Sequence, residues 1–160
     1  MSGAATAWLG GALLLFASIY LGVGFTQVVL QFPGAVEKTP AASFPERFGD
    51  PVRRAVAYFA VQSVLMVVGS AALTAAEWDQ GGYRYGPLVY LVATVVATTF
   101  TVVFILPVNR ALYREVPDEA EFKRLLTRWV RLNVVRAGMW VVEWAAIALW
   151  FVALATGVER

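Results

Sequence analysis

Residues 132–156, LNVVRAGMWVVEWAAIALWFVALAT, decide the fold of this chain. As a helix rising about 1.5 Å per residue, this stretch is long enough to cross a hydrocarbon core of about 30 Å. Backbone groups in lipid must be hydrogen-bonded within their own segment, so the stretch is predicted to be helical. Arg136 and Glu143 stand inside it. Because charged groups are costly in lipid, we expect both to face protein or a polar cavity.

Three further apolar segments, residues 6–32, 52–76 and 87–106, are also long enough to span a membrane. Of the 160 residues, 59% are hydrophobic and 15% are charged. Soluble domains carry about 25% charged residues. The first segment has no basic residue before it, so we expect a retained span rather than a cleaved signal. The sequence predicts an all-α, integral membrane four-helix bundle, with residues 1–160 as a single four-span domain.

The basic residues gather in two of the connections between spans. These are Lys38, Arg47, Arg53 and Arg54 in the first connection, and Arg110, Arg114, Lys123, Arg124, Arg128 and Arg131 in the third. Only Arg84 and Arg160 lie on the opposite side. Cytoplasmic loops are enriched in Lys and Arg, so both termini are predicted outside a bacterial plasma membrane. A net charge of +2 distributed in this way predicts membrane lipids, and not nucleic acid, as partners.

Residues 118–131 are amphipathic, and neither Gly nor Pro interrupts residues 118–137. We therefore expect a long fourth helix of about 40 residues that extends into the cytoplasmic interface. Asp50 before Pro51 is typical of a helix start, which places the beginning of the second span there. Tryptophans near the predicted span ends indicate an aromatic belt. They are Trp8, Trp78, Trp129 and Trp150.

The chain contains no cysteine and no histidine. This excludes disulfides, thiol redox centres and iron–sulfur clusters, and it removes the usual ligands of haem and of most zinc, copper and iron sites. Glu143 is the one carboxyl inside the predicted spans. We therefore expect no metal and no cofactor.

One face of the fourth helix carries the candidate functional residues. Their spacings of 4, 3, 4 and 3 place Trp129, Asn133, Arg136, Trp140 and Glu143 on the same side. Arg136 and Glu143 are about 10 Å apart along the helix axis. Three interpretations stay open for this pair: structural pairing, a ligand or proton-handling role, and contact with another subunit.

The first two spans also carry large polar residues. Gln27 lies near the end of the first span, while Tyr58 and Gln62 share a face of the second at a spacing of four residues. Hydrogen bonding between helices and contact with a ligand are both compatible with these positions. We include all three among the candidate ligand-binding residues.

Two short motifs resemble those of a known family. Residues 106–112, LPVNRAL, contain Pro-x-Asn-x-x-Leu, and Trp129 is followed by Asn133 and Arg136. The chain resembles the anthrone oxygenase-like family of small four-span membrane proteins, whose second motif is Trp-x-x-x-His-x-x-Arg. Members oxidise anthrones to anthraquinones without a metal or organic cofactor. The resemblance implies functional roles for Pro107 and Asn109, and it aligns Asn133 with the family histidine.

That replacement changes the expected chemistry. An amide such as Asn133 cannot accept a proton near neutral pH, although it can orient a substrate or stabilise an oxyanion. Glu143 is the remaining carboxyl that can act as a base, about 15 Å further along the helix axis. We therefore predict Glu143, Arg136 and Asn133 as the catalytic group.

Two functions follow as expectations. In the first, the bundle binds and oxidises a flat apolar aromatic or quinoid ligand. Asn109, Asn133 and Arg136 would hold its oxygens, and Trp129 and Trp140 would stack on its rings. In the second, the chain is a non-catalytic accessory subunit of a larger membrane complex, for example a respiratory or photosynthetic one. Its partners would then be other membrane subunits or copies of itself.

Overall fold

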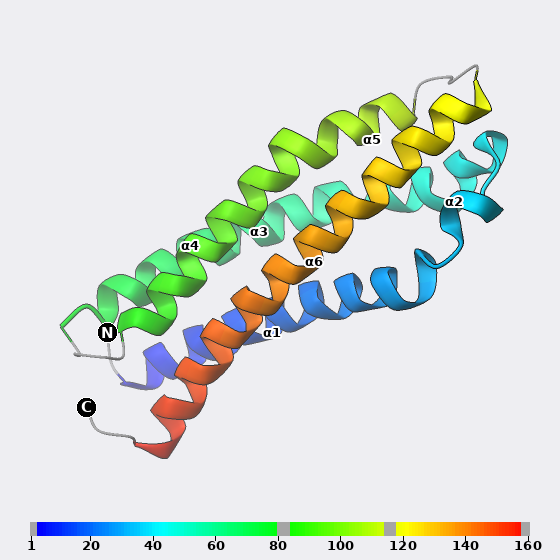
Figure 1. The fold of residues 1–160 in the computed structure, drawn as a ribbon. Helices are drawn as coiled ribbons and strands as arrows, with labels where there is room; N and C mark the ends of the chain where they lie inside the picture. Colours follow the sequence, from blue (N-terminus) through cyan, green and yellow to red (C-terminus); the bar gives the residue numbers. More distant parts are fainter. Residues whose placement is uncertain (1–2, 80–83, 114–117, 158–160) are drawn as a thin grey trace.

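The computed structural model describes residues 3–79, 84–113 and 118–157, and these residues form helices joined by short connections (Figure 1). In chain order the elements are α1 (Gly3–Thr26), η1 (Gln27–Gln31), α2 (Ala35–Lys38), η2 (Ala41–Ser43), η3 (Pro45–Gly49), α3 (Asp50–Ala76), α4 (Tyr85–Phe100), η5 (Thr101–Ile105), α5 (Leu106–Leu112) and α6 (Glu119–Thr156).

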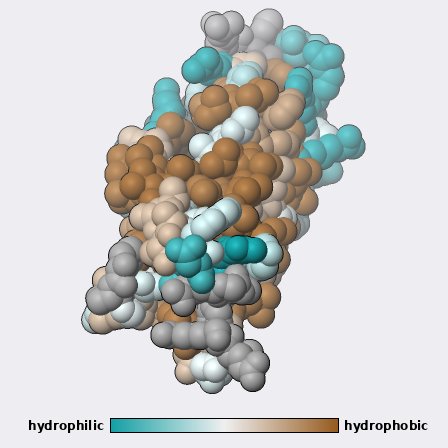
Figure 2. Space-filling model, turned by 90° about the vertical axis from the view of Figure 1, so that its left-hand side faces the viewer, coloured by the Kyte–Doolittle hydropathy of each residue, from teal (hydrophilic) through white to brown (hydrophobic). Residues whose placement is uncertain are grey.

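Four continuous helical rods are long and apolar enough to cross a membrane: Gly3–Gln31, Ala41–Ala76, Tyr85–Leu112 and Glu119–Thr156. This confirms the predicted all-α, four-helix membrane bundle. Hydrophobic side chains cover the middle of the face seen in Figure 2, and hydrophilic ones gather toward its ends. Such a surface suits a hydrocarbon environment between two polar interfaces.

The start of α1 and the end of α6 lie at one end of the bundle, together with the end of α3 and the start of α4 (Figure 1). The opposite end holds α2, the end of α5 and the start of α6, which brings the two basic connections together. Arg114 and Arg160, counted among the basic residues, lie outside the described residues. Which end faces the cytoplasm stays a prediction.

The long fourth helix is confirmed, since α6 runs from Glu119 to Thr156 without a break. Its start is capped by Asp118, whose carboxylate accepts a hydrogen bond of 3.0 Å from the Ala120 backbone N–H. α6 packs along both α1 and α4, and α3 in turn packs on α4 and α1 (Figure 1).

The predicted role of Asp50 as an N-cap is wrong, although α3 does begin at Asp50. The helical rod already begins at Ala41, and η3 continues directly into α3. Asp50 caps no backbone N–H; its carboxylate pairs with Arg53 instead. Because Pro45 already supplies the fixed φ of a helix start, the turn before Asp50 is helical too. The aromatic belt is likewise only half correct, since Trp129 and Trp150 are buried, whereas Trp8 and Trp78 are exposed.

Each of the three π-helical turns ends two residues before a proline. Pro33, Pro51 and Pro107 follow η1, η3 and η5 in this way. In an α-helix a proline ring clashes with the carbonyl four residues earlier, which here is the middle of each π turn. The residue just before each proline donates instead to the carbonyl five residues back, as Phe32 does to Gln27 at 2.9 Å. The wider turn lets the second and third rods continue through Pro51 and Pro107, whereas the first rod ends at Gln31, before Pro33.

Glycines let two tryptophans of α6 lie against neighbouring helices. Trp150 fits between Gly10 on α1 and Gly86 on α4, and a Cβ added at Gly86 would stand 2.5 Å from Trp150 Cβ. A Cβ at Gly24 would meet Trp140 at 2.7 Å. Separations this short are not tolerated, so these glycines are required for the observed packing.

We expect Gly10→Ala to lower the free energy of unfolding by about 1–3 kcal/mol, because its methyl group would overlap the Trp150 ring. Denaturation of the detergent-solubilised protein with increasing SDS measures this change. Gly22→Ala is the matched control, since a Cβ there meets nothing within 4 Å. Equal stability of the two variants would contradict the packing described above.

Candidate functional site

A cavity of about 460 Å³ lies between the four rods, within the range of small-molecule sites. We call it the central cavity. Its walls are mostly apolar and come from α1, η1, α3, α4, η5, α5 and α6. The polar or charged side chains among its lining are Tyr20, Gln27, Ser63, Thr94, Thr98, Thr101, Asn109, Asn133, Arg136 and Glu143, together with the indoles of Trp129 and Trp140.

A chain of hydrogen bonds links the two motifs on one wall of this cavity. The Trp129 indole N–H donates to the side-chain oxygen of Asn109 at 2.6 Å, joining α6 to α5. The Asn133 amide donates to the Trp129 carbonyl at 2.8 Å, and its oxygen accepts from Arg136 at 2.5 Å. All these groups are buried or half-buried, so each bond is made where water cannot replace it. We call this chain the Asn109–Arg136 relay.

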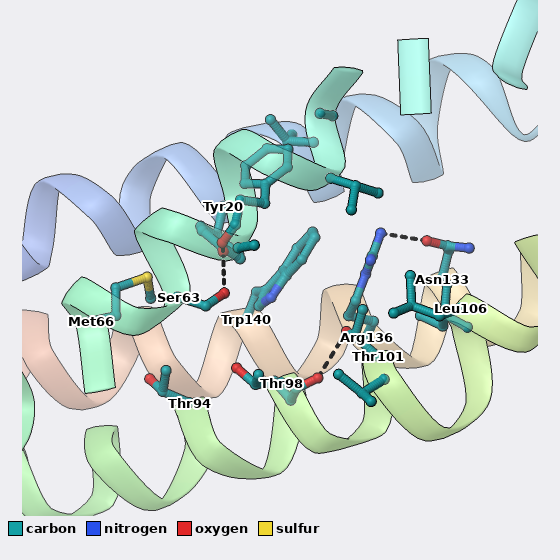
Figure 3. A pocket seen from close by; sticks show the side chains of 18 of the residues that line it. Tyr20, Ser63, Met66, Thr94, Thr98, Thr101, Leu106, Asn133, Arg136 and Trp140 are labelled. Carbon is teal, nitrogen blue, oxygen red and sulfur yellow. Dashed lines mark hydrogen bonds between the residues drawn. The ribbon is translucent and has the colours of Figure 1, made fainter. Parts of the chain in front are cut away.

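Trp140 lines the cavity next to the relay. The Arg136 guanidinium lies over its ring, with Cζ 4.5 Å from the ring centroid, a cation–π contact. On the other side Tyr20 meets the ring edge-on, with centroids 4.9 Å apart. The Tyr20 hydroxyl bonds the Phe59 carbonyl and shares a 2.7 Å hydrogen bond with Ser63. Figure 3 shows Trp140 between these two groups.

Glu143 lies in the part of the cavity beyond Trp140. It is 1% exposed, and its Oε2 has no hydrogen-bond partner. Thr94, on the facing helix α4, lies beside this carboxyl. Within the described residues Glu143 and Arg136 form no ion pair, and Arg136 Nε is unpartnered as well. Each buried polar atom without a hydrogen-bond partner costs about 1–3 kcal/mol. This arrangement therefore favours binding of a ligand that supplies the missing hydrogen bonds.

The structure places the predicted site residues unevenly. Gln27 lines the cavity, as do the six predicted from α5 and α6. Tyr58 does not, because it is 55% exposed and its ring packs on Phe59 at the outer surface. Gln62 is buried but points away, donating to the Phe16 carbonyl of α1 at 3.1 Å. Neither Tyr58 nor Gln62 therefore lines the central cavity.

The sequence analysis did not predict that Thr94 lines the central cavity beside the Glu143 carboxyl. Threonine in a membrane helix usually bonds its own backbone, as Thr101 does to the Ala97 carbonyl at 2.8 Å. The available signal was the spacing of Thr94, Thr98 and Thr101, which puts one hydroxyl face on the α4–η5 rod. Figure 3 shows the three side chains along this rod, on the side of the cavity.

The fold and cavity define a class, namely a four-helix membrane-type bundle with charged and aromatic groups lining an internal cavity. In a comparison with protein-family models, residues 52–148, more than half of the chain, match the family described as anthrone oxygenase. The chain belongs to this family. The matched region contains the whole Asn109–Arg136 relay. No match was found among curated proteins or among solved structures.

We expect Asn109→Leu to lower the free energy of unfolding by about 1–3 kcal/mol, because it leaves the buried Trp129 N–H without an acceptor. The same change made in a Trp129→Phe background should cost less, since the donor is already gone. SDS denaturation of the four proteins gives the coupling between the two side chains. Equal costs in both backgrounds would show that the hydrogen bond contributes nothing.

Proposed function

We propose that this protein binds a flat aromatic ketone of the anthrone class in the central cavity and oxidises it with molecular oxygen. The observation that carries the proposal is that Arg136 and Glu143 line the same cavity without forming an ion pair among the described residues, and that Glu143 Oε2 has no hydrogen-bond partner. The Lys and Arg distribution supports a bacterial plasma membrane as the site of action, with the basic connections cytoplasmic.

The relay supports a role for Arg136 in holding the ring oxygen. The side chain of Asn133 accepts from Arg136 and donates to the Trp129 carbonyl, which fixes the guanidinium position and leaves one amide N–H available. A guanidinium carries five donors, so Arg136 can bind a carbonyl oxygen and stabilise the negative charge that develops there when the ring carbon is deprotonated.

Glu143 is the proposed base. In an anthrone the reactive CH₂ lies across the central ring from the carbonyl, so a base and an oxygen-binding cation must stand at opposite ends of the ligand. Arg136 and Glu143 are about 10 Å apart along the helix axis, and side chains reaching into the cavity shorten that span. Asn133 cannot take this role, because both ends of its amide are engaged and amides are not bases at neutral pH.

The proposed reaction balances with oxygen as the only co-reactant. Glu143 accepts one proton from the ring CH₂, and the resulting carbanion is delocalised onto the carbonyl oxygen held by Arg136. Molecular oxygen then takes four electrons in total, and the CH₂ becomes a second carbonyl. One oxygen atom is retained in the anthraquinone, and the other leaves as water with the two hydrogens of the CH₂.

We expect Arg136→Leu to abolish binding of anthraquinone while the protein still accumulates in the membrane, because the ring oxygen loses its cationic partner. Native mass spectrometry from mild detergent measures the retained ligand. Arg131→Leu, an exposed position on the same helix, is the control. Undiminished binding in Arg136→Leu would contradict the proposal. Loss of partner chains from that variant would instead favour the accessory-subunit interpretation.

We expect Glu143→Gln to keep anthraquinone binding but to lose the oxidation of anthrone, since the amide cannot accept the proton. The absorbance of anthraquinone formed from anthrone in air-saturated vesicles, corrected for the spontaneous reaction, measures the rate. Glu121→Gln on the exposed side of α6 is the matched control. A wild-type rate in Glu143→Gln would remove this residue from the mechanism.

A further inference from the structure

The central cavity reaches the outer surface between α3 and the α4–η5 rod. Val64 on α3 and Val102 on η5 both line the cavity, yet they are 61% and 55% exposed. Val56, Ala60 and Val68 also line it and, with Val64, follow one another at every fourth residue. They therefore form an exposed apolar stripe along one edge of the opening.

The opening exists because α3 diverges from the other rod. α3 packs on α4, whereas η5 and α5 pack on α6. Figure 1 shows α3 and the α4–α5 rod separating toward the α5 end. The π turn of η5, set by Pro107, lies at the edge of the opening, and π turns are frequent at functional sites.

The rim of this opening is apolar, and the charges lie behind it. The stripe on α3 consists of valine and alanine, and the facing edge of Thr98 and Val102 is equally small and uncharged. The two charged lining residues, Arg136 and Glu143, are both on α6. A ligand passing through the opening therefore meets only small apolar or hydroxyl groups before it reaches a charge.

Both ends of the cavity are closed by packed side chains. At the end near the basic connections, Trp129 and Phe48 pack edge to face with ring centroids 5.8 Å apart, within a cluster that also contains Phe32, Phe44 and Phe122. At the other end lies a second buried cluster, which includes Leu13, Leu73, Tyr90 and Ile147. Among the described residues that line the cavity, those classed as exposed all lie on α3 and η5, so the cavity meets the surroundings on this side.

We propose that the cavity receives its ligand sideways from the lipid, through the opening between Val64 and Val102. The ligand is an uncharged, flat aromatic ketone or phenol dissolved in the hydrocarbon region, because a charged or strongly hydrated molecule would not enter the hydrocarbon that surrounds this apolar rim. This inference rests on the proposed function and adds to it the phase from which the substrate is drawn.

The chain offers a direct test, because it contains no cysteine and because Met66, fully buried, lines the cavity. Benzophenone dissolved in phosphatidylcholine vesicles is the probe, since on irradiation this aromatic ketone inserts preferentially next to methionine sulfur. A Val64→Cys/Val102→Cys variant is reconstituted and its thiols are joined by bifunctional thiosulfonate reagents of graded length, after folding. Peptide mass spectrometry then measures labelling of Met66.

Joining the two edges should abolish labelling of Met66, and reduction of the linker should restore it. Met139, which does not line the cavity, serves as an internal reference. The control pair, Val134→Cys/Val141→Cys, is exposed on α6 away from the cavity and should leave Met66 labelled when joined. Undiminished Met66 labelling with the edges joined would overturn lateral access alone. An unlinked protein that is never labelled at Met66 would overturn both this inference and the proposed binding of aromatic ketones.

Discussion

The hydrogen bond from the Trp129 indole to Asn109 is the interaction on which the site depends. In lipid a buried N–H finds no water, so it must be satisfied by protein. Asn109 can serve because the π turn before Pro107 lets the third rod continue past the proline and present α5 to α6. The bond fixes the rotation of α6 about its own axis. From that rotation follow the positions of Asn133 and Arg136, each held by the group before it.

The separation of charge along α6 gives the cavity its chemical character. Arg136 is oriented by Asn133 and shielded by the Trp140 ring, whereas Glu143 is left without a cationic partner. In a direct ion pair, Arg136 and Glu143 would have satisfied each other, and neither charged group would have been available to bind a ligand. The two groups instead stay apart in one largely apolar cavity, an arrangement that a neutral polar ring compound can bridge.

Much of this arrangement was predictable because helical periodicity is a local property. The 4-3-4-3 spacing predicted which face of α6 points into the bundle. The absence of Gly and Pro from residues 118–137 predicted that α6 is long. The π turns were not predictable, since a proline either ends a helix or distorts it, and the neighbouring helices decide which. The helix rise predicted the axial separation of Arg136 and Glu143. It did not predict that the Trp140 ring would lie against the Arg136 guanidinium. The sequence analysis assigned Tyr58 and Gln62 to the ligand site because they share a helix face. Their spacing does not predict how that face is oriented toward α1 and the cavity.

The fit of Trp150 between Gly10 and Gly86 also constrains how such a chain can diverge. None of the three positions can change freely by itself: a larger residue at either glycine collides with the indole, and a smaller residue at 150 leaves a void in the bundle. The three positions, which lie on three different helices, are therefore expected to change together. In related sequences, a smaller side chain at one of these positions should be accompanied by a larger side chain at another, so that the total side-chain volume is kept.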